Sequence, residues 1–117
     1  MTKNELITCF QDTLQISEGR LRKNTTSSIK LNRVYKENFL SKVAHKDENA
    51  IISIYSRTSF SVAKEYCKYG KVAVLNFANP HNPGGGVCNG AMAQEECLCR
   101  SSNLYVCINN ENVFNEY

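Results

Sequence analysis

Residues 50–77 read AIISIYSRTSFSVAKEYCKYGKVAVLNF, and this stretch decides the expected fold. Residues 50–57 are rich in β-branched side chains, which predicts a strand. Residues 58–70 place apolar side chains at helical spacing, between a Ser or Thr N-cap and a closing glycine. Residues 71–77 form a near-continuous apolar run, as in a parallel strand covered on both faces. The stretch therefore predicts a strand–helix–strand unit and an α/β domain.

Further elements are expected on either side of this unit. A threonine and a glutamate three residues apart open the chain with capping-box spacing, which predicts a helix over residues 3–18. Alternation in residues 27–35 predicts another strand. Residues 91–108 predict a helix with Asn89 as its N-cap. The segment before that helix is rich in proline and glycine and follows a buried strand, where α/β folds place their ligands.

Size and composition are those of one ordinary domain, with 117 residues, 42% hydrophobic and 21% charged. No signal peptide is recognisable, so we expect a cytoplasmic protein whose six cysteines are buried small side chains rather than disulfides. The net charge of +3 hides a basic segment. We favour a solvated surface over a polyanion-binding surface for its eight cations, which are Arg20, Arg22, Lys23, Lys30, Arg33, Lys36, Lys42 and Lys46.

The glycine run Gly84-Gly85-Gly86 has two interpretations that the sequence leaves open. Residues without Cβ let backbone N–H groups approach an anion closely, and a following helix start adds positive potential. A phosphate or diphosphate would suit such a loop. A plain tight connection is an equal alternative, since neither a Walker A loop nor a dinucleotide fingerprint is present.

The triplet Gln94-Glu95-Glu96 follows in the first turns of the expected helix. Adjacent helical residues point about 100° apart, so the two carboxylates should have different roles. Glycosidic cleavage needs a carboxylic acid that protonates the leaving oxygen. A neighbouring carboxylate favours the protonated acid, whereas the helix N-terminus favours the charged form, and the sequence does not decide between them. Two solvated glutamates at a helix start are the alternative interpretation.

Taken together, residues 72–105, VAVLNFANPHNPGGGVCNGAMAQEECLCRSSNLY, resemble the catalytic signature of the microbial-type poly(ADP-ribose) glycohydrolases (PARG). The resemblance lies in a GGG loop followed by QEE, after an NFAN strand end and before LCRSSNLY. It implies a macrodomain-like α/β fold, a mixed sheet flanked by helices. Residues 1–117 would then be a single domain that holds the N-terminal half of that fold.

The resemblance also implies roles for individual residues. Glu96 matches the catalytic acid that protonates the ribose oxygen of the ribose–ribose bond, and Glu95 matches the glutamate that holds ribose hydroxyls. Gln94 supports the helix start. Asn79 matches an asparagine that contacts the distal ribose, whereas Asn76 is more structural. The loop that approaches the diphosphate and the distal ribose is matched by Gly84, Gly85, Gly86 and Val87.

The function implied by the resemblance is hydrolysis of ribose–ribose O-glycosidic bonds, with release of ADP-ribose and without metal or cofactor. The expected ligand is ADP-ribose or its polymer, with ADP-ribosylated proteins as an alternative, and neither a membrane nor a specific nucleic-acid sequence is expected as a partner. Two rival hypotheses are a non-catalytic ADP-ribose-binding module and an inactive fragment.

Overall fold

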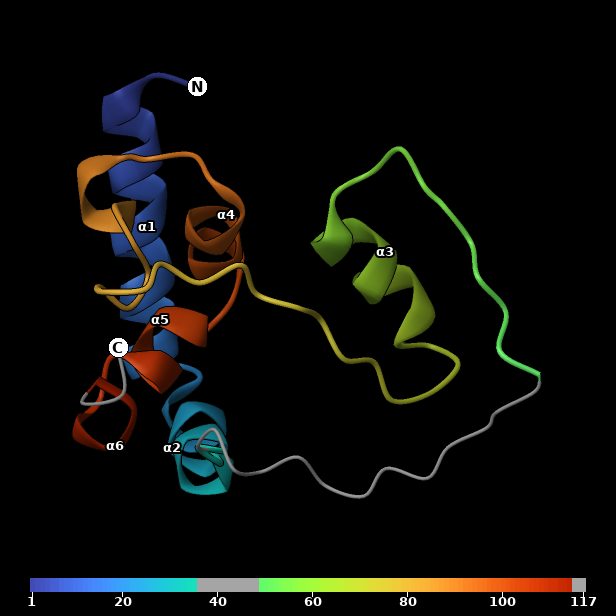
Figure 1. Cartoon of the computed structure of the whole chain (residues 1–117). Helices are drawn as coiled ribbons and strands as arrows, with labels where there is room; N and C mark the ends of the chain where they lie inside the picture. The colour runs from blue at the N-terminus through green and yellow to red at the C-terminus, as the bar shows by residue number, and fades with distance from the viewer. Residues whose placement is uncertain (36–48, 115–117) are drawn as a thin grey trace. The chain divides into compact units, whose positions relative to one another are not determined.

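The computed structural model describes residues 1–35 and 49–114, and the regular secondary structure of this part of the chain consists of helices joined by irregular segments (Figure 1). No β-strand occurs in the described ranges. The expected mixed sheet, and with it the macrodomain-like α/β fold, is therefore wrong. The described residues fall into two compact units, one made of residues 1–34 and 76–114, the other of residue 35 and residues 49–75.

The first helix confirms the expected helix over residues 3–18. Helix α1 spans Lys3–Glu18, and its N-cap is Thr2. The Glu5 amide donates to the Thr2 hydroxyl at 3.3 Å, and the Thr2 amide donates to the Glu5 carboxylate at 2.6 Å. This reciprocal capping box satisfies amides that have no partner inside the helix.

Helix α2, Arg22–Leu31, replaces the strand expected over residues 27–35. Tertiary contacts decide its conformation, because the Thr25 hydroxyl donates to the Ser17 carbonyl at 3.0 Å and Asn32 Nδ2 donates to the Cys107 carbonyl at 2.6 Å. A short alternation of apolar residues favours a strand only where a neighbouring strand is available for pairing, so here these contacts decide the conformation. The described cations of the basic segment are exposed, and Lys36, Lys42 and Lys46 lie outside the described residues.

The second unit contains helix α3, Ser59–Tyr66, with Thr58 as its N-cap, which confirms a helix between the two expected strands. The strands over residues 50–57 and 71–77 are wrong, and so is the strand–helix–strand unit. A parallel strand is stable only beside another strand that accepts and donates its backbone hydrogen bonds. Ile51 and Ile54 are instead 91% and 95% exposed.

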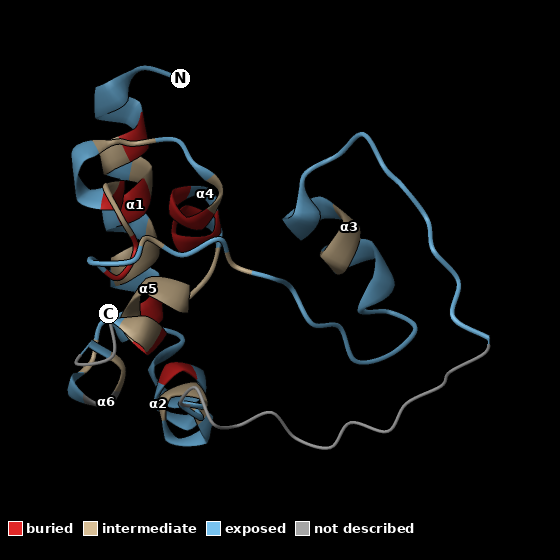
Figure 2. Ribbon diagram, in the orientation of Figure 1, coloured by how far each residue is buried: buried red, intermediate tan, exposed pale blue. Residues whose placement is uncertain are grey.

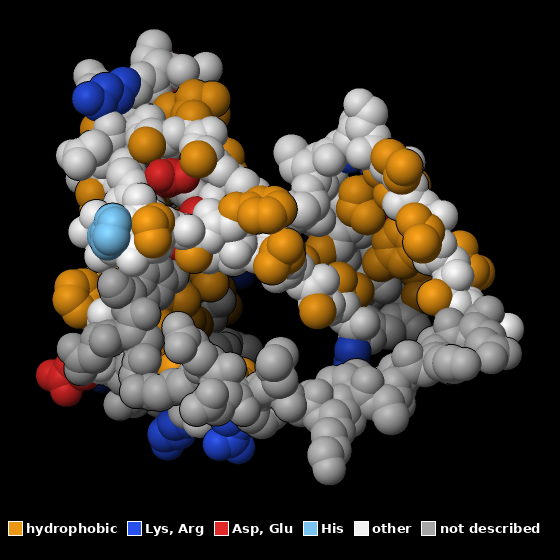
Figure 3. All heavy atoms as spheres, in the orientation of Figure 1, with side chains coloured by type: hydrophobic (Ala, Val, Ile, Leu, Met, Phe, Trp, Pro, Cys, Tyr) orange, Lys and Arg blue, Asp and Glu red, His pale blue; other side chains and the backbone are white. Residues whose placement is uncertain are grey.

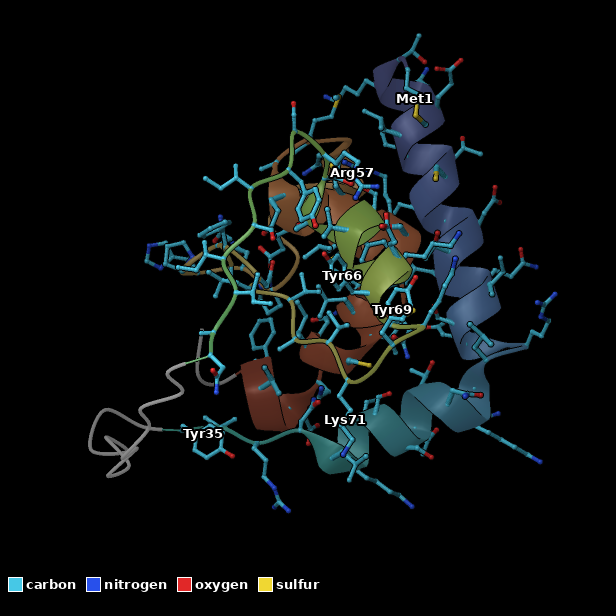
Figure 4. All side chains as sticks on the ribbon, turned by 90° about the vertical axis from the view of Figure 1, so that its right-hand side faces the viewer. Met1, Tyr35, Arg57, Tyr66, Tyr69 and Lys71 are labelled. Carbon is cyan, nitrogen blue, oxygen red and sulfur yellow. The ribbon has the colours of Figure 1, made fainter. Side chains whose placement is uncertain are left out.

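No residue of α3 is buried, as its lack of red in Figure 2 shows. Hydrophobic side chains also cover much of the visible surface of this unit in Figure 3. Contacts between polar side chains hold it locally. Arg57 donates to Glu65 at 2.8 Å, and its guanidinium lies 5.2 Å from the ring centroid of Tyr55. Figure 4 labels Arg57, which precedes α3, Tyr66 at the end of α3, and Tyr69, which follows it; the ring centroids of Tyr66 and Tyr69 are 6.4 Å apart.

The first unit has a core built from four helical elements. Phe10 of α1, Val87 of the 3-10 turn η1 (Val87–Asn89) and Cys99 of α4 (Gln94–Ser101) are its buried centre. Tyr105 of α5 (Leu104–Ile108) packs edge-on against Phe10, with ring centroids 5.0 Å apart. A short helix α6, Glu111–Phe114, follows. This core fixes η1 and α4 against α1, and these are the elements that carry the predicted site.

The single helix expected over residues 91–108 is two helices, α4 and α5. Helix α4 begins later than expected, with Ala93 rather than Asn89 at its N-cap. Its last residue is Ser101, and its C-cap is Ser102. The Ser102 backbone is extended (φ −154°, ψ 177°), and the Ser102 hydroxyl donates to the Leu98 carbonyl at 2.8 Å. Serine side chains compete in this way with the helical backbone bonds, which is why the pair of serines here ends the helix.

The cysteines are all free, but only part of the expectation for them holds. Cys99 and Cys107 are buried, whereas Cys67, Cys88 and Cys97 are exposed. No helix within residues 1–35 and 49–114 is long and apolar enough to cross a membrane.

We predict that Phe10→Ala lowers the free energy of unfolding by about 3–5 kcal/mol, because it leaves a cavity at the centre of the core. Phe77→Ala is the matched control, since the Phe77 side chain is 72% exposed and its removal should change stability by about 0.5 kcal/mol or less. Urea unfolding followed by circular dichroism measures both. Equal losses in the two variants would contradict this assignment of the core.

Candidate active site

The loop before α4 is built around the Asn79 side chain and two left-handed glycines. Asn79 Oδ1 accepts hydrogen bonds from the His81 and Asn82 amides, both at 2.9 Å. The Gly85 amide then donates to the Asn82 carbonyl at 2.9 Å. Gly84 and Gly85 have φ values of +76° and +56°, which only glycine adopts readily. The loop is thus turned tightly toward the start of α4.

Glu95 holds this loop from inside the protein. Its side chain is only 2% exposed, and both carboxylate oxygens accept hydrogen bonds. Oε1 accepts from the Gly84 amide at 3.1 Å and from Asn76 Nδ2 at 3.2 Å, while Oε2 accepts from the Asn79 amide at 2.8 Å. A buried carboxylate requires such donors, and here the loop supplies them.

Glu96 is bound differently, because only one of its oxygens is engaged. Oε1 accepts from the Gly86 amide at 2.9 Å, whereas Oε2 is buried and has no hydrogen-bond partner among the described residues. The whole residue is 7% exposed. Gln94, the third member of the triplet, accepts a hydrogen bond from the Phe77 amide at 2.8 Å. The three adjacent side chains therefore all accept hydrogen bonds from residues 76–86, and each accepts from different residues of that segment.

The glycine run is required because neighbouring groups occupy the space that side chains would need. A Cβ on Gly85 would lie 2.5 Å from Glu96 Oε1, and a Cβ on Gly84 would lie 2.6 Å from the Tyr105 ring. A Cβ on Gly86 would lie 2.9 Å from the Ala91 methyl group. All three glycine amides donate to acceptors within the protein. The loop amides thus bind acceptors inside the protein, two of which are the side chains of Glu95 and Glu96, and the phosphate or diphosphate expected at this loop stays a prediction.

A cavity of about 480 Å³ adjoins the other side of the loop. Burial raises the pKa of Tyr105 to about 12, with a further contribution from the Cys88 hydrogen bond, so its hydroxyl stays protonated at neutral pH. Glu96 is not among the cavity walls. The residues that line the cavity are Asn79, Asn82, Pro83, Gly85, Gly86, Asn89, Tyr105, Asn109 and Phe114.

The structure brings most of the predicted site together around the carboxylates. The exception is the side chain of Val87, which is fully buried and packs in the core with Phe10 and Cys99. Sequence reasoning missed Tyr105 as a wall of the cavity, although it lies within the quoted signature. It also missed Arg100. The available signal was the spacing of four residues between Glu96 and Arg100, because residues at this spacing share a helix face.

Fold and site together define a helical domain with a buried glutamate pair that is held by a glycine loop beside a cavity. The sequence model described as microbial-type PARG, catalytic domain, matches residues 5–117, and the chain belongs to this family. Membership of this family indicates poly(ADP-ribose) glycohydrolase activity. No curated protein and no solved structure matches the chain.

We predict that Gly85→Ala destabilises the protein, because alanine at φ +56° costs about 1–2 kcal/mol and its methyl group would collide with the Glu96 carboxylate. Gly70→Ala is the matched control, since a Cβ there meets nothing within 4 Å. That variant should leave stability unchanged or raise it by about 0.4–1 kcal/mol. Urea unfolding compares the two, and an equally stable Gly85→Ala would refute the proposed crowding.

We predict that Cys99 is the slowest cysteine to react with iodoacetamide at pH 8. Burial, reinforced by the negative charges of Glu95 and Glu96, raises its pKa to about 12. The reactive thiolate is therefore scarce as well as inaccessible. Peptide mass spectrometry of timed samples should show the exposed Cys67, Cys88 and Cys97 modified first. Early labelling of Cys99 would contradict its place in the core.

Proposed function

We propose that the chain hydrolyses ribose–ribose O-glycosidic bonds of poly(ADP-ribose), with Glu96 as the general acid. The observation that carries the proposal is the asymmetry of this carboxyl group. The Gly86 amide fixes Oε1, while Oε2 is buried and finds no partner in the part of the chain that the structure describes. A general acid needs one oxygen held in place and the other available to carry the proton. Family membership supplies the substrate class.

The chemistry that we assign to Glu96 is the one that the family resemblance implies. The protonated Oε2 gives its proton to the ribose oxygen that leaves, while the bond to the anomeric carbon breaks and an oxocarbenium-like sugar develops. Water then attacks the anomeric carbon, and the Glu96 carboxylate takes up the proton that this water loses. The acid is thereby regenerated, and ADP-ribose is released.

Glu95 supports this step chiefly by holding the loop. It accepts hydrogen bonds from the Gly84 and Asn79 amides and from Asn76 Nδ2, so the loop that positions Glu96 is itself fixed. Its negative charge would also stabilise the positive charge that develops on the sugar. A further bond from Glu95 to ribose hydroxyls, as the family resemblance implies, would require the substrate to compete with these internal donors.

We place the ADP-ribose unit in the cavity beside the glycine loop. Its volume of about 480 Å³ lies in the ordinary range of roughly 300–1,000 Å³ for small-molecule sites. The amide side chains of Asn82, Asn89 and Asn109 offer donors and acceptors to sugar hydroxyls or phosphates. The Tyr105 ring offers an aromatic surface for a base or a sugar face.

A non-catalytic ADP-ribose-binding module is the second candidate. One observation favours it: the cavity is lined by Asn79, Gly85 and Gly86 but not by Glu96. In that case the ligand would be bound by the loop and the asparagines without reaching the acid.

We predict that Glu96→Gln lowers the rate of ADP-ribose release from poly(ADP-ribose) by about 10²–10⁴-fold, because glutamine cannot donate the proton. Its amide oxygen can still accept the Gly86 N–H, so the loop should be preserved. Glu65→Gln, at a half-exposed site on α3, is the matched control and should match the wild type. Chromatography of the released ADP-ribose measures the rate.

Two outcomes separate the candidate functions. Unchanged release in Glu96→Gln would refute Glu96 as the acid. Binding of ADP-ribose by calorimetry, without release by the wild-type chain, would favour the binding module instead.

A further inference from the structure

Arg100 is a buried cation that neither the proposed reaction nor the core explains. It lies on α4 one helical turn after Glu96 and is only 7% exposed. Its Nη2 donates to the Ala91 carbonyl at 2.6 Å, whereas Nη1 is buried and has no hydrogen-bond partner within residues 1–35 and 49–114. Burial of a guanidinium is costly when its main bond is to a neutral carbonyl. A buried arginine at this position therefore indicates a role that an apolar side chain could not perform.

The bond from Arg100 reaches the same turn that holds Glu96. The Ala91 amide donates to the Gly86 carbonyl at 3.1 Å, and the Ala91 methyl group lies against the Gly86 backbone, where a Cβ would come within 2.9 Å of it. The Gly86 amide in turn donates to Glu96 Oε1 at 2.9 Å. Residues 86–91 are thus held to α4 at both ends, by Glu96 at one end and by Arg100 at the other.

We propose that Arg100 is a positioning residue for Glu96: by holding the Ala91 carbonyl it fixes the Gly86 amide that orients the carboxyl group. The expected effect of Arg100 on the reaction rate rests on the proposed function. Its expected effect on the hydrogen bond between Gly86 and Glu96 does not. Arg100 does not line the cavity that we assign to ADP-ribose, so it should act on the orientation of the acid and not on affinity. A misplacement of about 1 Å in such a group can cost roughly 10²-fold in rate.

The test compares Arg100→Met, which removes the donor, with Arg100→Lys, which keeps a charged donor. Arg57→Met is the matched control, because Arg57 also pairs through its guanidinium but lies on the second unit with its side chain 43% exposed. Steady-state release of ADP-ribose gives kcat and KM for the full 117-residue chain. Amide hydrogen exchange of Gly86, followed by NMR, reports directly on the hydrogen bond to Glu96.

We expect Arg100→Met to lower kcat by about 10- to 100-fold with KM within about twofold, and to speed Gly86 exchange by about tenfold. Arg100→Lys should recover most of both effects, and Arg57→Met should show neither. A lower kcat with unchanged Gly86 exchange would overturn the proposal. So would a change in KM alone, or a lysine variant no better than methionine.

The remaining outcomes also decide the question. If the wild type releases no ADP-ribose, the proposed function fails, and Gly86 exchange alone then confirms or refutes the role of Arg100. If Arg100→Met does not fold, Arg100→Gln takes its place, since it is neutral but still has a donor. Failure of both variants to fold, judged by circular dichroism, would overturn the positioning role in favour of a purely structural one.

Discussion

The bonds from the loop amides to the Glu95 carboxylate are the interaction on which the site depends. A carboxylate that is only 2% exposed is stable only with donors around it, and the Gly84 and Asn79 amides provide them. Those amides in turn need acceptors, because they lie in a loop and not in a helix or sheet that would supply backbone carbonyls. The loop and the start of α4 therefore fix each other, and Glu96 is positioned as a consequence.

The core and the site share residues, which ties the loop to the rest of the first unit. Val87 follows the glycine run directly and is one of the three buried residues at the centre of the core. Tyr105 packs edge-on against Phe10 and also lines the cavity. Changes in the packing of α1 or α5 should therefore reach the cavity without any substitution in its walls.

The sequence predicted best what local interactions decide. The capping box at Thr2 and the hydroxyl cap at Thr58 needed only neighbours within three residues, and both helices form. The closeness of the glycine run and the glutamates was predictable as well, because only 10 or 11 positions separate the residues that bind each other. The expected strands were wrong, because strand pairing depends on segments far apart in sequence, and apolar patterns do not say whether a partner is present. The contact of Arg100 could not be predicted, because its partner is the Ala91 carbonyl. Every residue has a backbone carbonyl, so a bond to one leaves no pattern in the sequence.

The internal use of the glycine amides has a consequence for protein engineering. The helix that carries Glu95 and Glu96 is only eight residues long, and it lacks a side-chain cap of its own. Its first turn is completed by residues 76–91, which lie outside it. Grafting this helix alone onto another scaffold would leave two buried carboxylates without donors. The smallest unit that can be transplanted, or exchanged among relatives, is the segment from Asn76 to Arg100 as a whole.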